Sequence, residues 1–201
     1  HPSGYEIQLG RPLDFYAVTD HANYLGMLDA MANPDHPASK IPGAARFTQE
    51  KASYGKRLAD YGPQRQLVVE HLDVDVKRNA WARVVDAANR HNDPGRFTAF
   101  IGYEYTSHPS ANLHRNVIFR GSRAPDLPFS RLESQNPEAL WAWMDDLRAQ
   151  GIESMAIPHN SNGSDGRMFD DVTYDGDPLD AAYAETRMRN EPLVEVTQVK
   201  G

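Results

Sequence analysis

Five short β-like runs separated by helical patterns constrain the fold of this chain more than any other feature. The runs cover residues 13–20, 97–104, 113–120, 154–159 and 193–198. Several of them are almost continuously apolar, which is typical of strands buried on both faces of a parallel sheet. Strands that alternate with helices form βα units, so we predict an α/β fold with a mainly parallel sheet or a barrel.

Two helices are well marked between these runs. Apolar residues recur every fourth position over 75–91, which predicts an amphipathic helix. A second helix is predicted after Asn136, because Asn is a favoured N-cap, Pro137 suits the first helical position and Gly151 suits the terminus.

The chain length favours a single domain. At 201 residues with 40% apolar residues, the chain can bury one substantial core. We predict long loop insertions at 33–64 and 160–192, which are rich in Pro, Gly, Asn and Asp. No run of eighteen apolar residues occurs, so we predict no membrane span. The chain starts with His and ends on a strand-like segment, and we expect it to be a piece of a longer protein.

Charge and cysteine content exclude several functions. The formal net charge is −7, and the basic residues are scattered among acids, which argues against a nucleic-acid partner. The chain has no cysteine, so disulfides, thiolate catalysis and Cys-type zinc sites are excluded. Any metal must therefore be held by His, Asp or Glu. Neither feature identifies a compartment or an oligomeric state.

Acids and imidazoles stand at the ends of four of the five runs. Asp20 and His21 follow the first run, Glu104 ends the second, His114 enters the third and His159 ends the fourth. In α/β folds the chemistry gathers at the carboxyl ends of the strands. Imidazole and carboxylate ligands suit divalent ions such as Zn, Mn or Fe, and a carboxylate can bridge two ions. We predict a metal site built from the three histidines and Glu104.

These residues could also have other roles. A single histidine at a strand end is usually an ordinary core or loop residue, and only the agreement among four segments favours ligation. Asp20 can cap the helix that follows it or orient His21, and we favour the second role. Arg115 and Arg167 are candidate substrate-binding residues, although a surface or strand-edge charge is the default for each.

Five motifs in order along the chain resemble the PHP (polymerase and histidinol phosphatase) superfamily of metal-dependent phosphoesterases. They are "RPLDFYAVTDHANYLG", "FIGYEYTS", "NLHRNVIFR", "IPHNSNGSDGRMF" and "NEPLVEVTQVKG". More narrowly, the chain resembles a family of larger proteins with a PHP-related domain of unknown function. "TDH" alone is a weak match, whereas all five motifs together are specific.

The resemblance implies a distorted (β/α) barrel whose strand ends bind up to three divalent metal ions. It implies that His21, Glu104, His114 and His159 are metal ligands, with Glu104 as the bridging carboxylate. Members of the superfamily also carry an H-x-H motif on the first strand and a D-x-H motif on the last, and this chain has neither. The barrel is therefore expected to be incomplete here, either because the chain is an excerpt or because it is a degenerate member.

The function expected from these observations is hydrolysis. A metal-bound hydroxide would attack a small phosphate ester, with Glu104 and Asp20 as catalytic residues. A related barrel could instead hydrolyse an amide or a lactone, because one fold hosts several chemistries. A third alternative is a non-catalytic metal-binding accessory domain.

Overall fold

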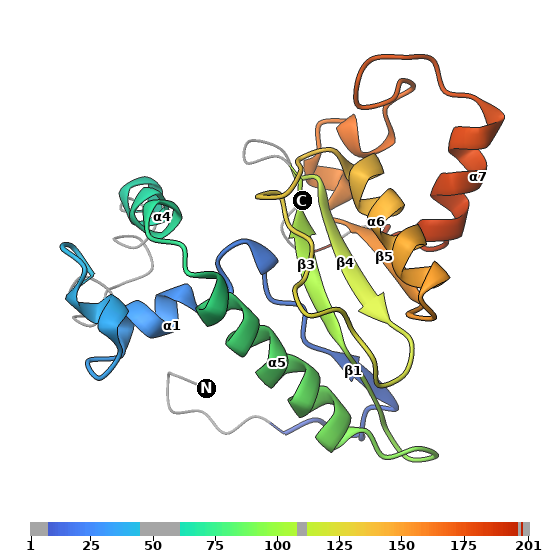
Figure 1. Ribbon diagram of the computed structural model, residues 1–201. Helices are drawn as coiled ribbons and strands as arrows, with labels where there is room; N and C mark the ends of the chain where they lie inside the picture. The colour runs from blue at the N-terminus through green and yellow to red at the C-terminus, as the bar shows by residue number, and fades with distance from the viewer. Residues whose placement is uncertain (1–7, 45–60, 108–111, 197, 199–201) are drawn as a thin grey trace.

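The computed structural model describes residues 8–44, 61–107, 112–196 and 198, which form a mixed α/β fold (Figure 1). The strands are β1 (Phe15–Ala17), β2 (Thr98–Phe100), β3 (Gly102–Thr106), β4 (His114–Phe119) and β5 (Ser154–His159). The helices are α1 (Met27–Ala32), α4 (Tyr61–Glu70), α5 (Val74–His91), α6 (Pro137–Ala149) and α7 (Ala181–Asn190). Short 3₁₀ turns are η1 (Ala22–Tyr24), η2 (Pro37–Lys40), η3 (Ser161–Gly163) and η4 (Arg167–Phe169).

The strands form two small sheets. β1 pairs with β2 in parallel, while β3, β4 and β5 form an antiparallel sheet in that order. The prediction of a mainly parallel sheet is therefore wrong for the larger sheet. β4 begins at His114, soon after β3 ends at Thr106, and a connection this short joins antiparallel strands. The sheets of the described residues do not close into a barrel.

Other boundaries also differ from the prediction. The run 97–104 contains two strands, β2 and β3, of different sheets. The run 193–198 forms no strand in its described residues, although the backbone N–H of Glu195 donates to the carbonyl of Pro158 at 3.0 Å.

The predicted loop insertions are only partly loops. The segment 160–192 contains α7 as well as η3 and η4. The segment 33–64 contains η2 and the start of α4, and its residues 45–60 lie outside the described part of the chain.

Both predicted helices are confirmed, and Asn136 caps α6 as expected. The side chain of Asp73 accepts hydrogen bonds from the first backbone N–H groups of α5, and Asn136 does the same for α6. After α6 the chain turns at Gly151, whose φ of +77° is a left-handed conformation that glycine adopts without strain.

The main core lies on one face of the antiparallel sheet. Trp81 of α5 packs edge-on against Tyr103 of β3, with ring centroids 5.7 Å apart, and Trp143 of α6 packs against the same ring at 6.5 Å. Tyr103 and Phe119 are at most 1% exposed. Helices α5 and α6 therefore cover the face to which Tyr103 points. α7 packs outside α6 and against β5 (Figure 1).

Candidate metal centre

The strand register places three of the predicted ligands on the other face of the same sheet. Successive side chains of a strand point to opposite faces, and directly paired residues share a face. His114 pairs with His159 across β4 and β5, and with Thr106 across β3 and β4. Glu104 stands two residues before Thr106 and so shares this face. The face opposite the aromatic core thus carries Glu104, His114 and His159.

His21 reaches this face from a separate segment. It follows β1 and forms an isolated parallel bridge with Glu104 at the free edge of β3. The backbone N–H of Glu104 donates to the carbonyl of Asp20 at 2.9 Å, which fixes the chain next to the strand. The pairing brings residues 20 and 21 beside a strand that is distant in sequence.

Three of the four predicted ligands form one cluster. His21, Glu104 and His114 each offer a ligand atom, and these atoms lie within 4.8 Å of one another. A divalent ion sits about 2 Å from nitrogen and oxygen ligands, so small side-chain rotations suffice for a shared ion. Two imidazoles and a carboxylate form a donor set that suits Zn, Mn or Fe.

The carboxylate of Glu104 lies between the two imidazoles. Its Oε1 is 2.5 Å from Nδ1 of His114, and its Oε2 is 3.7 Å from Nδ1 of His21. Nδ1 of His21 is also 2.9 Å from the hydroxyl oxygen of Thr106, which is a buried residue. These contacts hold the rings of His21 and His114 nearly perpendicular, with an interplanar angle of 82°.

Electrostatics favour the ionised form of Glu104. Burial raises the pKa of this carboxyl. The hydrogen bond with His114 and the charges of His21, His114 and His159 lower the pKa by more than burial raises it, so the pKa lies below its ordinary value. A carboxylate that stays ionised while buried is the form that binds a cation.

His159 lies near the cluster without joining it. Its ring centroid is 6.4 Å from that of His114. Its Nδ1 is 2.8 Å from Oε2 of Glu195, and its Nε2 is 3.3 Å from the side-chain nitrogen of Gln198. Both ring nitrogens therefore face the segment that follows α7.

The predicted arginines lie away from the cluster. Arg115 points to the face opposite His114, where its Nε donates to the buried carboxylate of Glu191 at 2.8 Å. The guanidinium of Arg115 thus forms a buried ion pair. Arg167 is exposed and lines, with Arg115 and Arg187, a separate pocket of about 320 Å³. The two predicted substrate-binding residues therefore meet in one pocket, but not beside the histidines.

Asp20 contributes through its backbone. Its carbonyl accepts from Glu104, as described above, and its side chain is exposed. The N-cap of the following 3₁₀ turn is His21, which makes no side-chain capping bond. The alternative that Asp20 caps this element therefore does not hold, and the orientation of His21 by Asp20 stays a prediction.

Three further residues lie around the centre and were not predicted from the sequence: Thr106, Glu195 and Gln198. The sequence does carry a signal for Glu195, because it is an acid inside the apolar run 193–198, just as Glu104 is an acid at the end of an apolar run. Thr106 follows Glu104 at the two-residue spacing that keeps side chains on one face of a strand. No sequence pattern marks Gln198.

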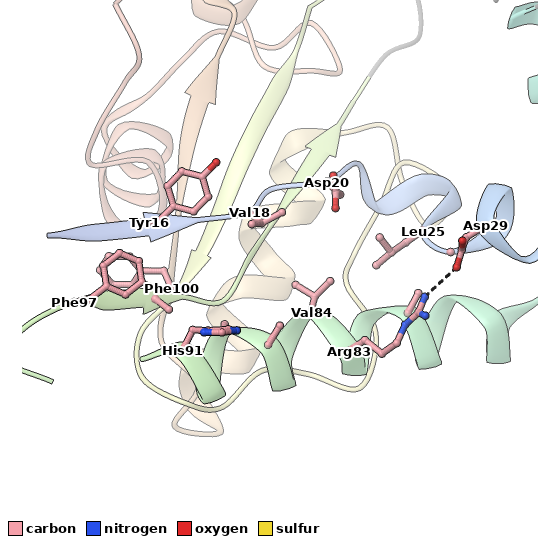
Figure 2. Close-up of a pocket in the computed structure, with 15 residues that line it drawn as sticks. Tyr16, Val18, Asp20, Leu25, Asp29, Arg83, Val84, His91, Phe97 and Phe100 are labelled. Atoms are coloured by element: carbon pink, nitrogen blue, oxygen red, sulfur yellow. Dashed lines mark hydrogen bonds and ion pairs between the residues drawn. The ribbon is translucent and has the colours of Figure 1, made fainter. Parts of the chain in front are cut away.

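A larger cavity lies beside this centre. It has a volume of about 670 Å³ and lies between β1, β2 and α5, with mostly apolar walls such as Phe97, Phe100 and Val84 (Figure 2). An ion pair of Arg83 with Asp29 spans 3.5 Å at one end. Of the predicted site residues, all of which the structure describes, Asp20 alone lines it. The clustered imidazoles and carboxylate are therefore separate from this apolar space.

The fold and the cluster together define a mixed α/β protein with a candidate His–Glu–His metal centre. The whole chain, residues 1–201, matches the family model described as "Protein of unknown function (DUF3604)", so the chain belongs to this family. No curated protein and no solved structure matches the chain. Within the described residues, no helix combines the length and apolarity that crossing a membrane requires.

Proposed function

We propose that the protein is a metal-dependent hydrolase, and specifically a phosphoesterase that acts on a small phosphate ester. The observation that carries this proposal is the cluster of His21, Glu104 and His114, whose ligand atoms lie within 4.8 Å of one another. Burying a carboxylate costs free energy, and clusters of buried ionisable groups are typical of functional sites. Glu104, with an imidazole beside each of its carboxylate oxygens, is such a group.

The residues of the cluster fit a divalent ion of the Zn, Mn or Fe type. His21, Glu104 and His114 would hold it, with His159 as a further ligand beside them. When bound, such an ion lowers the pKa of coordinated water and offsets negative charge on phosphoryl oxygens. Glu104 supplies the ionised carboxylate, and Thr106 orients the ring of His21. The side chain of His21 is 54% exposed, which leaves the centre open to a substrate.

The resemblance to the PHP superfamily supports the choice of phosphoesterase. A distorted PHP-type barrel that is incomplete in this chain, up to three metal ions in a complete site and the orientation of His21 by Asp20 all belong to this proposal. Arg167 is the arginine that remains available for an anionic group, since it is exposed. We assign Arg115 a structural role, because Glu191 neutralises it in the core.

Metal content tests whether the cluster of His21, Glu104 and His114 binds a metal ion. We would purify wild type without chelator and measure bound metal by elemental mass spectrometry, beside Glu104→Gln, His21→Ala and the control His71→Ala. His71 is exposed, and its Nδ1 lies 3.0 Å from the backbone carbonyl oxygen of Leu67 in α4. We expect wild type and His71→Ala to carry Zn, Mn or Fe, and the other two to lose it. Equal metal in all four proteins would contradict the assignment.

Turnover separates the alternatives. Chelator-sensitive hydrolysis of a phosphate ester panel, lost in Glu104→Gln, would support a phosphoesterase. Cleavage of amides or lactones instead would favour the related hydrolase activity. Metal binding without turnover on any panel would favour a metal-binding accessory domain.

A further inference from the structure

The segment after α7 contacts both nitrogens of the His159 ring. Glu195 places its Oε2 2.8 Å from Nδ1, and Gln198 places its side-chain nitrogen 3.3 Å from Nε2. Among the described residues this buried Nδ1 atom has no hydrogen-bond partner in good alignment, although it lies within ion-pair distance of the Glu195 carboxylate. A small rotation of the ring would align the Nδ1–H with the carboxylate.

These two contacts indicate the same tautomer. The amide nitrogen of Gln198 is a donor only, so its contact with Nε2 requires an unprotonated Nε2. A neutral imidazole then carries its proton on Nδ1, which faces the acceptor Glu195. The Nε2 atom then carries the lone pair that His159 can offer to a metal ion.

Glu195 is itself held firmly at the end of β5. Its Oε2 accepts from the backbone N–H of Asn160 at 2.9 Å, and its own N–H donates to the carbonyl of Pro158 at 3.0 Å. The hydroxyl of Ser161 donates to the carbonyl of Glu195 at 3.2 Å. The position of this carboxylate relative to His159 is therefore fixed by backbone contacts on both sides of His159.

We propose that Glu195 is a positioning residue that holds His159 in the Nδ1–H tautomer, and that Gln198 occupies the Nε2 position that a metal ion takes. The inference rests on the proposed function, because it assigns the fourth ligand of that centre. Carboxylates that accept from the second nitrogen of a metal-binding histidine fix its orientation and raise its basicity. Gln198, by contrast, competes with the ion for the same lone pair.

The two residues should therefore act on metal affinity in opposite directions. Removing the charge in Glu195→Gln should weaken metal binding about tenfold, the lower end of the range for such partners. Removing the competing amide in Gln198→Ala should strengthen metal binding about threefold, which corresponds to the net contribution of one weak neutral hydrogen bond. In a His159→Ala background both effects should vanish.

The experiment measures Zn²⁺ affinity by competition with a chelating dye, and the His159 tautomer by two-bond ¹H–¹⁵N correlation of the metal-free protein. The matched control is Glu153→Gln, at the opposite end of β5, where Glu153 pairs with Arg120 at the surface. We expect the Nδ1–H tautomer in wild type and in Glu153→Gln, and a mixture of tautomers in Glu195→Gln.

Each outcome decides one of the proposals. An Nε2–H tautomer in wild type, or Zn²⁺ affinities of Glu195→Gln and Glu153→Gln that are equal, overturns the role of Glu195 while the metal centre stands. Persistence of the Glu195→Gln effect without His159 also overturns it. A wild type that binds no metal overturns both proposals. Metal binding with the expected changes but no turnover overturns only the hydrolase.

Discussion

Glu191 is a buried carboxylate shared by two arginines. Its Oε1 accepts from Arg115 at 2.8 Å and from the indole of Trp141 at 2.9 Å, while its Oε2 accepts from Arg187 at 3.2 Å. The side chains of Arg115 and Glu191 are 3% and 1% exposed. One side chain thus joins β4, α6 and α7 through charge-assisted hydrogen bonds.

Glu191→Gln should be strongly destabilising, because it leaves the guanidinium of Arg115 buried without a countercharge. We expect a loss of about 3–5 kcal/mol in the free energy of unfolding, measured by urea titration with tryptophan fluorescence. The control Glu185→Gln changes an exposed acid of α7 and should cost less than about 0.5 kcal/mol. Adding Arg115→Met to Glu191→Gln should recover part of the loss. A loss no larger than in the control would show that the ion pair contributes little.

Much of the candidate site could be predicted at the scale of single residues, because a titratable group at the end of an apolar run needs a partner. His21, Glu104 and His114 were chosen on that ground, and the fold brings them together. Arg115 was predicted to lie near the site as an anion binder, but it follows His114 on the same strand, and neighbours on a strand point to opposite faces. Glu195 could not be paired with His159 from sequence, since the contact depends on how a distant segment returns.

At the scale of elements, one acid connects the last two helices. Asp145 of α6 accepts from Arg189 of α7 at 2.6 Å and from Asn190 at 3.2 Å, and it also pairs with Arg148. The hydrogen bond from Arg189 is the main reason that the pKa of Asp145 lies below its ordinary value. Protonation of this carboxyl should therefore loosen the contact between α6 and α7.

Asp145→Asn should lower stability in a pH-dependent way. The folded-state pKa is below the unfolded value of about 3.9, so the stabilisation is fully present above about pH 5 and is lost as the pH falls through the folded pKa. We expect a difference of about 1 kcal/mol from wild type at pH 7, since the network is partly exposed, shrinking towards zero in acid. Urea unfolding at several pH values measures it. The control is Asp146→Asn, an exposed neighbour, and the same pH profile in both variants would contradict the role of Asp145.

Helices were easier to predict than strand pairing for a physical reason. The helix α5 follows from the apolar repeat over 75–91, and the start of α6 follows from local capping by Asn136, both of which the sequence displays directly. Strand direction depends on which runs pair, and an apolar run does not reveal its partner. The run 154–159 matched β5, whereas 193–198 has the composition of a strand but contacts β5 near its end through Glu195.

At the scale of the whole molecule, the α/β class was predictable and the distorted PHP-type barrel was not confirmed. The described residues form a parallel pair and an antiparallel sheet, and the segment after β1 meets the second sheet through the bridge of His21 with Glu104 and the contact of His21 with Thr106. The candidate centre therefore lies where two parts of the fold meet. Its donors come from segments far apart in sequence, and His21 and its partner Thr106 are separated by 85 positions.

Because the centre joins distant segments, metal binding should stabilise the entire fold. An ion that binds only the folded chain adds RT ln(1 + [L]/Kd), about 2.7 kcal/mol at a free concentration of 100 times Kd. For a chain of this size we expect a rise in Tm of roughly 5–10 °C with metal, reversed by chelator. Scanning calorimetry measures it, and Glu104→Gln is the control because it removes the central carboxylate. A rise of the same size in Glu104→Gln would place the ion elsewhere, whereas a rise confined to wild type would show that this centre holds the two segments together.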